Sequence, residues 1–121
     1  MSTHNFKNLK VWNLAMELVK DVYKCVTDFP QDEKYRLNSQ IKRCVISIPS
    51  NIAEGSGRTT NKDFVRFLYT SLGSSYELET QLLLAHDFKF LNQSSFENLM
   101  SSIQEVQKML RGLIDRFNKI T

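Results

Sequence analysis

The sequence predicts an all-α fold, an antiparallel four-helix bundle of up-down-up-down topology formed by one domain over residues 1–121. Apolar residues recur at helical spacing in four stretches, joined by short polar connections near residues 28–32, 55–60 and 87–94. The chain has only four glycines and two prolines, whereas an all-β fold needs many more turns. Residues 1–7 are expected to form a flexible tail.

The first helix is expected from Leu9 to Thr27. Two neighbouring apolar stripes follow it and together cover about half of its circumference, whereas burying one seam needs only about 100°. The first stripe comprises Val11, Ala15, Leu18, Val22, Cys25 and Phe29. The second comprises Trp12, Met16, Val19, Tyr23 and Val26.

The second helix is expected from Asp32 to Glu54 and contains Pro49. Proline lacks a backbone N–H and crowds the carbonyl of Val45, so we predict a kink rather than a break, unfavourable by about 3 kcal/mol. Gly55 is expected to end this helix in a left-handed conformation. The apolar stripe is narrower here and comprises Leu37, Ile41, Cys44, Val45, Ile48 and Ile52.

The third helix is expected to follow Thr60, because Thr60 and Asp63 have the spacing of a capping box, and to end near His86. Its apolar arc again covers nearly half of the circumference. Three polar residues fall inside this arc, one turn apart: Ser71, Ser75 and Glu79. A carboxylate in that position needs a partner, because an unpaired buried charge is unfavourable by several kcal/mol.

The fourth helix is expected to begin at a capping box of Ser94 and Glu97 and to continue to Ile120. Its apolar face is also wide, so three of the four helices carry more apolar surface than one core requires. We therefore expect self-association into a closed homo-oligomer. The alternative is a well-packed single bundle with scattered exposed apolar residues, which are common.

A polar network is predicted along facing stripes of the second and third helices. Arg43 and Glu79 are expected to form a charge-assisted pair within or between subunits, with neighbouring hydroxyl and amide groups completing the hydrogen bonds. The alternative is that the same groups line a site for a ligand or nucleic acid. The network comprises Arg43, Ser47, Asn51, Glu54, Ser71, Ser75 and Glu79.

Basic residues are expected to cluster around the junction between the second and third helices. Phosphate recognition needs several cations within reach of one backbone, and a ring repeats each of them. The candidate nucleic-acid contacts are Lys42, Arg43, Arg58, Lys62 and Arg66. The alternative is an ordinary solvated face, since a net charge of +3 is compatible with a polyanion partner without requiring one.

The sequence lacks the patterns of common enzymes and metal sites. His4 and His86 are its only histidines, so no specific Ser-His-Asp set can be assembled, and no Cys/His spacing fits zinc. We therefore predict no enzymatic activity, no catalytic residue, no metal and no cofactor. A hydrolase that uses Glu54 and Glu79 is a less favoured alternative.

The cysteines, Cys25 and Cys44, lie on different expected helices and are interpreted as small core residues with reduced thiols. No apolar run approaches the roughly 18 residues of a membrane span, and the N-terminus has no apolar segment of a signal peptide. The chain is therefore expected to be cytoplasmic, without a membrane partner.

Three motifs carry a family resemblance: Phe6–Trp12, Ser47–Gly55 with Arg43 before it, and Leu72–Glu79. They resemble the four-helix-bundle proteins encoded in intervening sequences of bacterial 23S ribosomal RNA genes, and the resemblance covers nearly the whole chain. It implies a ring, typically a homopentamer. It also implies kinship with the accessory proteins of diversity-generating retroelements, whose similar rings bind a reverse transcriptase and nucleic acid.

These observations predict a non-enzymatic oligomeric protein that binds RNA, either ribosomal RNA or a structured transcript, through its basic surface. The alternative is a protein–protein scaffold that docks a partner enzyme, such as a reverse transcriptase, without contacting nucleic acid. Salt-dependent binding to unrelated RNAs distinguishes the two, because only the first predicts it.

Overall fold

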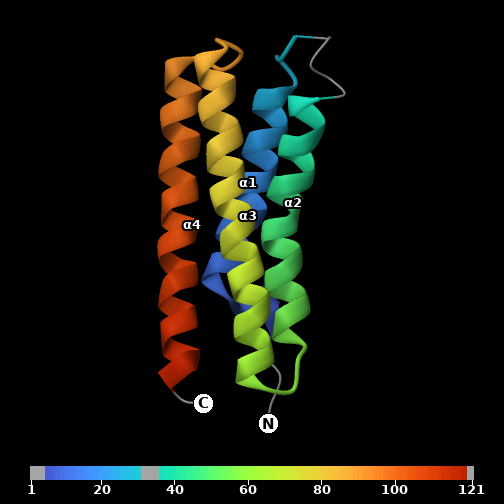
Figure 1. Cartoon of the computed structure of the whole chain (residues 1–121), viewed down its shortest axis with the longest axis vertical. Helices are drawn as coiled ribbons and strands as arrows, with labels where there is room; N and C mark the ends of the chain where they lie inside the picture. Colours follow the sequence, from blue (N-terminus) through green and yellow to red (C-terminus); the bar gives the residue numbers. More distant parts are fainter. Residues whose placement is uncertain (1–4, 31–35, 120–121) are drawn as a thin grey trace.

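The computed structural model describes residues 5–30 and 36–119, and within these ranges all regular structure is helical. A short 3-10 helix and four α-helices follow one another along the chain (Figure 1). They are η1 (Phe6–Asn8), α1 (Lys10–Val26), α2 (Leu37–Ser56), α3 (Asn61–Asp87) and α4 (Gln93–Lys119). The all-α class and the four helices are therefore confirmed. No helix in the described ranges is both long and apolar enough to cross a bilayer.

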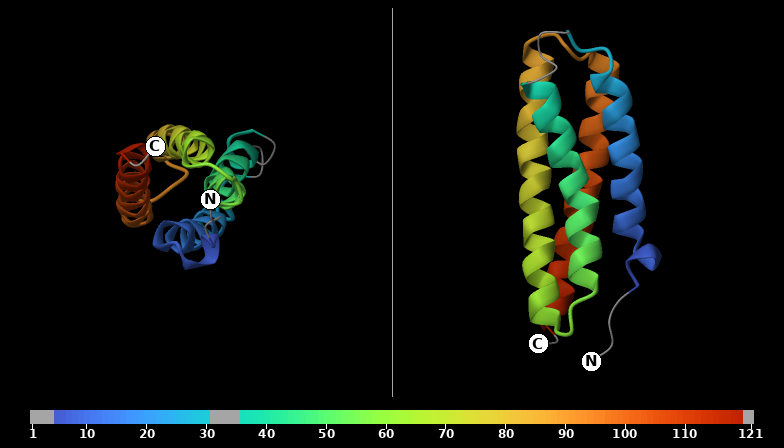
Figure 2. Two further views of the ribbon diagram at one scale, coloured as in Figure 1. Left: turned by 90° about the horizontal axis from the view of Figure 1, so that it is seen from below. Right: turned by 90° about the vertical axis from the view of Figure 1, so that its right-hand side faces the viewer.

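The four helices lie side by side along the long axis of the molecule. In Figure 1 the chain ascends along α1 and α3 and descends along α2 and α4, and Figure 2 shows the four axes around a common centre. The α2–α3 connection, η1 and the end of α4 therefore share one end of the bundle. Apolar side chains from all four helices fill the centre, among them Leu18, Ile48, Phe64 and Leu110, each less than 2% exposed.

The chain before α1 is more ordered than the predicted tail. The side chain of Asn5 accepts a hydrogen bond from the backbone N–H of Lys7 and caps η1. The ring of Phe6 packs edge-on against Trp12, with 5.1 Å between the ring centroids. Residues 5–7 therefore belong to a capped and packed turn, the predicted flexibility of the tail stays a prediction, and residues 1–4 lie outside the described ranges.

The two apolar stripes predicted for the first helix have different environments. Most of the first stripe lies in the core, namely Val11, Ala15, Leu18, Val22 and Phe29. Four members of the second stripe are only half-buried at the margin of the bundle, namely Trp12, Met16, Val19 and Tyr23. A single chain thus buries much of the wide apolar face by itself.

The bounds of α2 differ from the prediction at both ends. The expected start at Asp32 lies outside the described residues, and Arg36 has a non-helical backbone (φ −115°, ψ −104°). At the other end Gly55 does not stop the helix, because α2 continues to Ser56 and Gly57 caps it with φ −84°. No described glycine has a positive φ, so the predicted left-handed stop is wrong.

Gly55 is instead required by the close approach of α2 to α3. A Cβ atom at this position would lie 2.6 Å from the Cβ of Phe67 and 2.9 Å from Cδ1 of Phe64. These separations are shorter than van der Waals contact, so only glycine fits without a shift of one helix.

Pro49 lies inside α2 and does not break it, as predicted. Its missing N–H leaves the carbonyl of Val45 without the usual helical donor. At the same level the hydroxyl of the buried Ser71, on α3, donates to the carbonyl of Ile48 at 2.9 Å. Pro49 is itself buried, so tertiary packing against α3 offsets the unfavourable contribution of the proline.

In the N-terminal caps of both α3 and α4, a side-chain oxygen accepts a hydrogen bond from the backbone N–H three residues later. Thr60 Oγ1 accepts a hydrogen bond from the N–H of Asp63 at 3.1 Å, which confirms the predicted cap of α3. The predicted cap Ser94 is wrong, because Oδ1 of Asn92 accepts from the N–H of Ser95 at 2.8 Å and α4 begins at Gln93. Asparagine is among the best N-cap residues, and here it takes the role. The predicted end at Ile120 lies outside the described residues.

The end of α3 carries a left-handed residue that is not glycine. Lys89 has φ 65°. The N–H of Phe90 donates to the carbonyl of Ala85 at 2.9 Å, and the N–H of Lys89 donates to that of His86 at 3.0 Å. This pair of bonds is a Schellman motif, whose left-handed position favours glycine.

Replacing Lys89 by glycine is therefore expected to raise the free energy of unfolding by about 1 kcal/mol, because the left-handed conformation is unfavourable for a residue with a Cβ. Lys89→Ala is the matched control, since it removes the same charge but keeps the Cβ. Urea unfolding followed by circular dichroism measures both variants. Equal stabilities for the glycine and alanine variants would contradict the backbone argument.

Candidate nucleic-acid interface

Two arginines flank one aromatic ring where α2 connects to α3. The Cζ of Arg58 lies 4.6 Å from the ring centroid of Phe67, and the Cζ of Arg66 lies 4.7 Å from it. Each contact is a cation–π interaction, which contributes about 0.5–1 kcal/mol at an exposed site. We call these three residues the arginine–phenylalanine stack. Phe67 belongs by its spacing to the apolar face of α3, and the sequence pattern does not mark it as a partner of the arginines.

Two ion pairs orient the guanidinium groups of the stack. Nη2 of Arg58 lies 3.2 Å from Oε1 of Glu54, and Nη2 of Arg66 lies 3.0 Å from Oδ1 of Asp63. Both pairs are partly exposed, so each contributes only about 0–1 kcal/mol to stability. Their effect is geometric, because they hold the cations near the ring while Nη1 of each arginine donates to no other described residue. Such donors suit phosphate oxygens.

The stack lies at the end of the bundle that also holds η1 and the last turns of α4 (Figure 1). We define this basic end as residues 5–10, 54–66 and 113–119. It carries seven basic residues, Lys7, Lys10, Arg58, Lys62, Arg66, Arg116 and Lys119, against three acidic ones, Glu54, Asp63 and Asp115. This surplus of four positive charges exceeds the net charge of +3 of the whole chain, so the positive charge is concentrated here.

The five basic residues predicted to cluster lie in two separate places in the fold. Arg58, Lys62 and Arg66 lie at the basic end. Arg43 precedes the end of α2 at Ser56 by about thirteen residues, which places it about 20 Å along the helix axis from the junction that holds Arg58. Lys42 instead holds its Nζ 5.1 Å from the ring centroid of Tyr23 on α1. The prediction of one cluster is therefore wrong, because α2 carries Lys42 and Arg43 away from its junction with α3.

The predicted polar network forms only in part. Oγ of Ser47 lies 2.8 Å from Oγ of Ser74 across the seam between α2 and α3. Asn51 donates its amide to the carbonyl and hydroxyl oxygens of Ser47 at 2.8 and 3.0 Å. The predicted Ser75 instead donates to the carbonyl of Leu72 on its own helix at 2.6 Å. A shift of one residue rotates a helical side chain by about 100°, which explains why the neighbouring serine faces α2.

Arg43 and Glu79 do not pair within the chain. Oε1 of Glu79 accepts a hydrogen bond from Nε2 of Gln107 on α4 at 2.8 Å. Arg43 belongs to a cavity of about 230 Å³ between α2 and α3, lined by Gln40, Arg43, Cys44, Ser47, Ser74 and Glu77. The predicted pair is therefore wrong for a single subunit, because Glu79 is bonded to Gln107 on α4 and Glu77 is the carboxylate that lines the cavity with Arg43. A pair between subunits stays a prediction.

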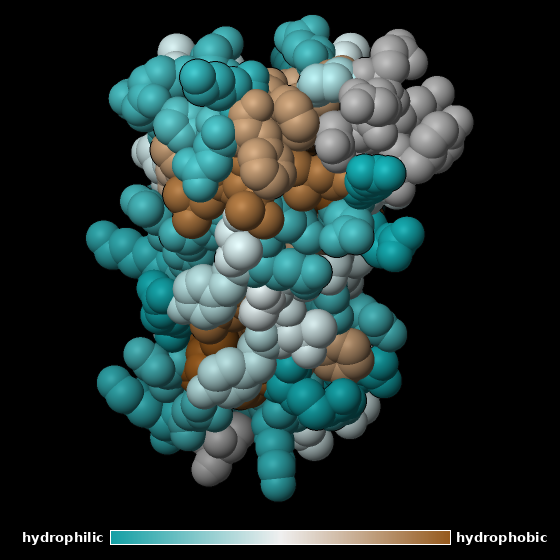
Figure 3. Space-filling model, turned by 45° about the horizontal axis from the view of Figure 1, so that its top comes forward, coloured by the Kyte–Doolittle hydropathy of each residue, from teal (hydrophilic) through white to brown (hydrophobic). Residues whose placement is uncertain are grey.

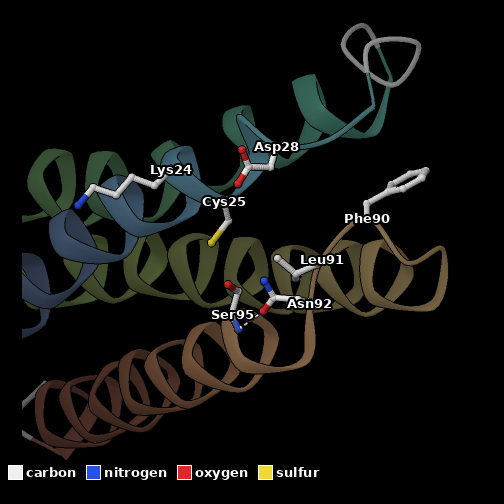
Figure 4. Close-up of a pocket in the computed structure, with 7 residues that line it drawn as sticks. All are labelled: Lys24, Cys25, Asp28, Phe90, Leu91, Asn92 and Ser95. Carbon is white, nitrogen blue, oxygen red and sulfur yellow. Dashed lines mark hydrogen bonds between the residues drawn. The ribbon is translucent and has the colours of Figure 1, made fainter.

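The two cysteines are shielded thiols. Burial, with the negative charge of Glu77, raises the pKa of the Cys44 thiol to about 12. Burial also raises the pKa of Cys25, which faces a cavity of about 240 Å³ bordered by Leu91 and Ser95 (Figure 4). A raised pKa keeps a thiol protonated at neutral pH, so neither cysteine is an activated nucleophile. The described residues contain no group of three or more His, Cys, Asp or Glu placed to hold a metal ion.

Comparison with known proteins gives a family and a fold. The family described as 23S rRNA-intervening sequence protein matches residues 7–112, which is most of the chain. No curated protein matches the sequence. Among solved structures, the chain is similar to a protein of unknown function from the S23 ribosomal protein family of Bacteroides thetaiotaomicron, with a TM-score of 0.78 and 23% identity over 86% of this chain and 97% of that one. At that identity the likeness shows a shared fold, and it is the match over residues 7–112 that shows membership. This chain belongs to the 23S rRNA-intervening sequence protein family.

Proposed function

We propose that this chain is a non-enzymatic, cytoplasmic protein that binds RNA through its basic end and works as a closed homo-oligomer. The observation that carries the proposal is the arginine–phenylalanine stack within a local surplus of positive charge. The description of the family names ribosomal RNA, which supports rRNA or a structured transcript as the ligand class.

The chemistry of the basic end suits a phosphate backbone. Neutralising phosphates with Lys and Arg releases counterions, and this release supplies most of the affinity of sequence-independent binding. Arg58 and Arg66 are pre-oriented by their ion pairs, so little side-chain freedom is lost on binding. A closed oligomer would repeat the same surface in every subunit and raise the avidity further.

The test is RNA binding by fluorescence anisotropy over about 50 to 200 mM salt, with wild type and two charge-matched triple variants. Arg58→Gln, Lys62→Gln and Arg66→Gln together are expected to lower the affinity about tenfold or more and to reduce the log–log salt slope by about one per lost contact. Lys20→Gln, Lys24→Gln and Lys108→Gln are the control, with affinity within about twofold of wild type. Equal losses in both variants, or no binding at low salt, would contradict the proposal.

The proposed assembly is an antiparallel bundle repeated in a ring, a pentamer by family resemblance. It is supported by a stripe on the outer face of α3 formed by Gly73, Tyr76, Thr80 and Leu83, which we call the α3 stripe. Tyr76 and Leu83 are 41% and 43% exposed and share one face of α3, and an exposed apolar patch, unlike scattered single residues, marks an interaction surface. A second subunit is the partner that a closed ring provides.

A second candidate function, docking of a partner protein such as a reverse transcriptase, is favoured by a different patch. Leu84 and Phe88, 42% and 58% exposed, lie at the end of α3 opposite the basic end. Figure 3 shows hydrophobic side chains gathered on this upper part of the molecule. Apolar side chains fit a protein surface better than phosphates. Binding of a partner protein that is insensitive to salt and unaffected by the basic-end variants would favour this second function.

A further inference from the structure

We infer that a hollow on α3, one turn before the α3 stripe on its basic-end side, binds a single unpaired nucleobase of RNA. The inference rests on the proposed RNA binding and specifies the form of RNA that the basic end takes. The hollow has a volume of about 420 Å³, within the range of small-molecule sites. It lies over the first turns of α3 and is lined by Thr60, Lys62, Asp63, Val65, Arg66 and Tyr69.

The hollow contains the exposed aromatic ring of Tyr69. Tyr69 is 54% exposed, and its phenol makes no hydrogen bond within the described residues. The adjoining Val65 is buried and gives the hollow an apolar floor. Stacking of a base on an exposed aromatic side chain contributes about 1–3 kcal/mol and tolerates every base, because each base has a flat π-face.

Cations border the same hollow. Lys62 has no ion pair or hydrogen bond of its side chain within the described residues, and it stands one helical turn before Arg66. Phosphates on either side of a stacked base can therefore meet Lys62 and Arg66 while the base lies against Tyr69. In a paired stem the bases are stacked inside the helix, so only an unpaired base can reach the ring.

Asp63 gives the hollow an acceptor without repelling phosphate. Its Oδ1 accepts from both Nε and Nη2 of Arg66, at 3.1 and 3.0 Å, so the two charges offset each other locally. Its Oδ2 accepts no hydrogen bond within the described residues. Guanine can donate to a carboxylate through both its N1–H and its exocyclic amino group, whereas uracil can donate only through its N3–H. The site is therefore expected to discriminate against uracil.

The first experiment compares a stem-loop RNA that carries one bulged guanine with the same stem fully paired. Wild type is expected to bind the bulged RNA about fivefold or more tightly, in line with one stacked base. Tyr69→Ala should remove this difference, whereas Tyr69→Phe should keep it because the ring is retained. Circular dichroism and thermal unfolding check that the exposed substitution leaves the fold intact.

The second experiment changes the bulged base from guanine to uracil. Wild type is expected to bind the uracil bulge about fivefold more weakly, and Asp63→Asn should reduce the difference to about twofold, since an amide can also donate to uracil. Equal binding of bulged and paired RNA, or equal weakening of both by Tyr69→Ala, would overturn the nucleobase site and leave the basic-end proposal standing. A wild-type protein that binds neither RNA at low salt would overturn both.

Discussion

Gly55→Ala is expected to lower the free energy of unfolding by about 2 kcal/mol, although alanine is the better helix former by about 1 kcal/mol. The added Cβ would lie 2.6 Å from the Cβ of Phe67. That atom is fixed to the backbone of α3 and cannot rotate away, so the two helices must separate. A larger residue such as valine at this position is expected to prevent folding.

Gly57→Ala is the matched control, because its Cβ would make only an ordinary contact, 3.6 Å from the carbonyl oxygen of Glu54, and its φ of −84° suits any residue. Its stability is expected to stay within about 0.5 kcal/mol of wild type. Urea unfolding measures both variants. A Gly55→Ala protein as stable as wild type would mean that helix propensity, and not the close approach, decides this position.

The same variant links packing to function. Phe67 holds Arg58 and Arg66 at the basic end, so a shift of its Cβ displaces both guanidinium groups. Gly55→Ala should therefore weaken RNA binding under conditions where the protein is still fully folded.

The helices could be predicted because their apolar spacing determines which face is buried. The bounds of α1 and α3 agree with the expected bounds to within one residue. Their exact ends depend on competition between neighbouring residues that the pattern cannot resolve. Asn92 and Ser94 are both good N-caps two residues apart, and the asparagine takes the role. Gly55 and Gly57 are both good helix ends, and contact with α3 keeps the first one helical.

The candidate site could be predicted by residue type but not by geometry. Arg58, Lys62 and Arg66 are recognisable as a basic run near a helix junction. The position of Phe67 between two of these cations depends on how closely α2 approaches α3, and nothing in the spacing of the sequence encodes that distance. The pairing of Ser47 with Ser74 instead of Ser75 has the same origin, since a small rotation of α3 selects between adjacent serines.

Gly73→Glu is expected to dissociate the proposed ring. Gly73 lies in mid-helix on the α3 stripe, and a Cβ there would meet nothing within 4 Å in a single chain. Glycine in an exposed helix interior is unfavourable by about 1 kcal/mol relative to alanine, and packing within this chain gives no reason for it. Because the exposed Tyr76 and Leu83 share its face of α3, close approach of a neighbouring subunit to the stripe supplies that reason in the proposed ring.

A glutamate placed between two subunits would be an unpaired buried charge, unfavourable by at least about 3 kcal/mol, which weakens assembly about 100-fold or more. Gly112→Glu is the matched control, because Gly112 is also exposed in mid-helix with nothing within 4 Å but lies on α4, whose described residues include no large exposed apolar side chain. Sedimentation velocity over a concentration series should show wild type and Gly112→Glu as one oligomer and Gly73→Glu as a folded monomer. If wild type is itself a folded monomer at high concentration, or if both variants assemble, the exposed stripe does not join subunits.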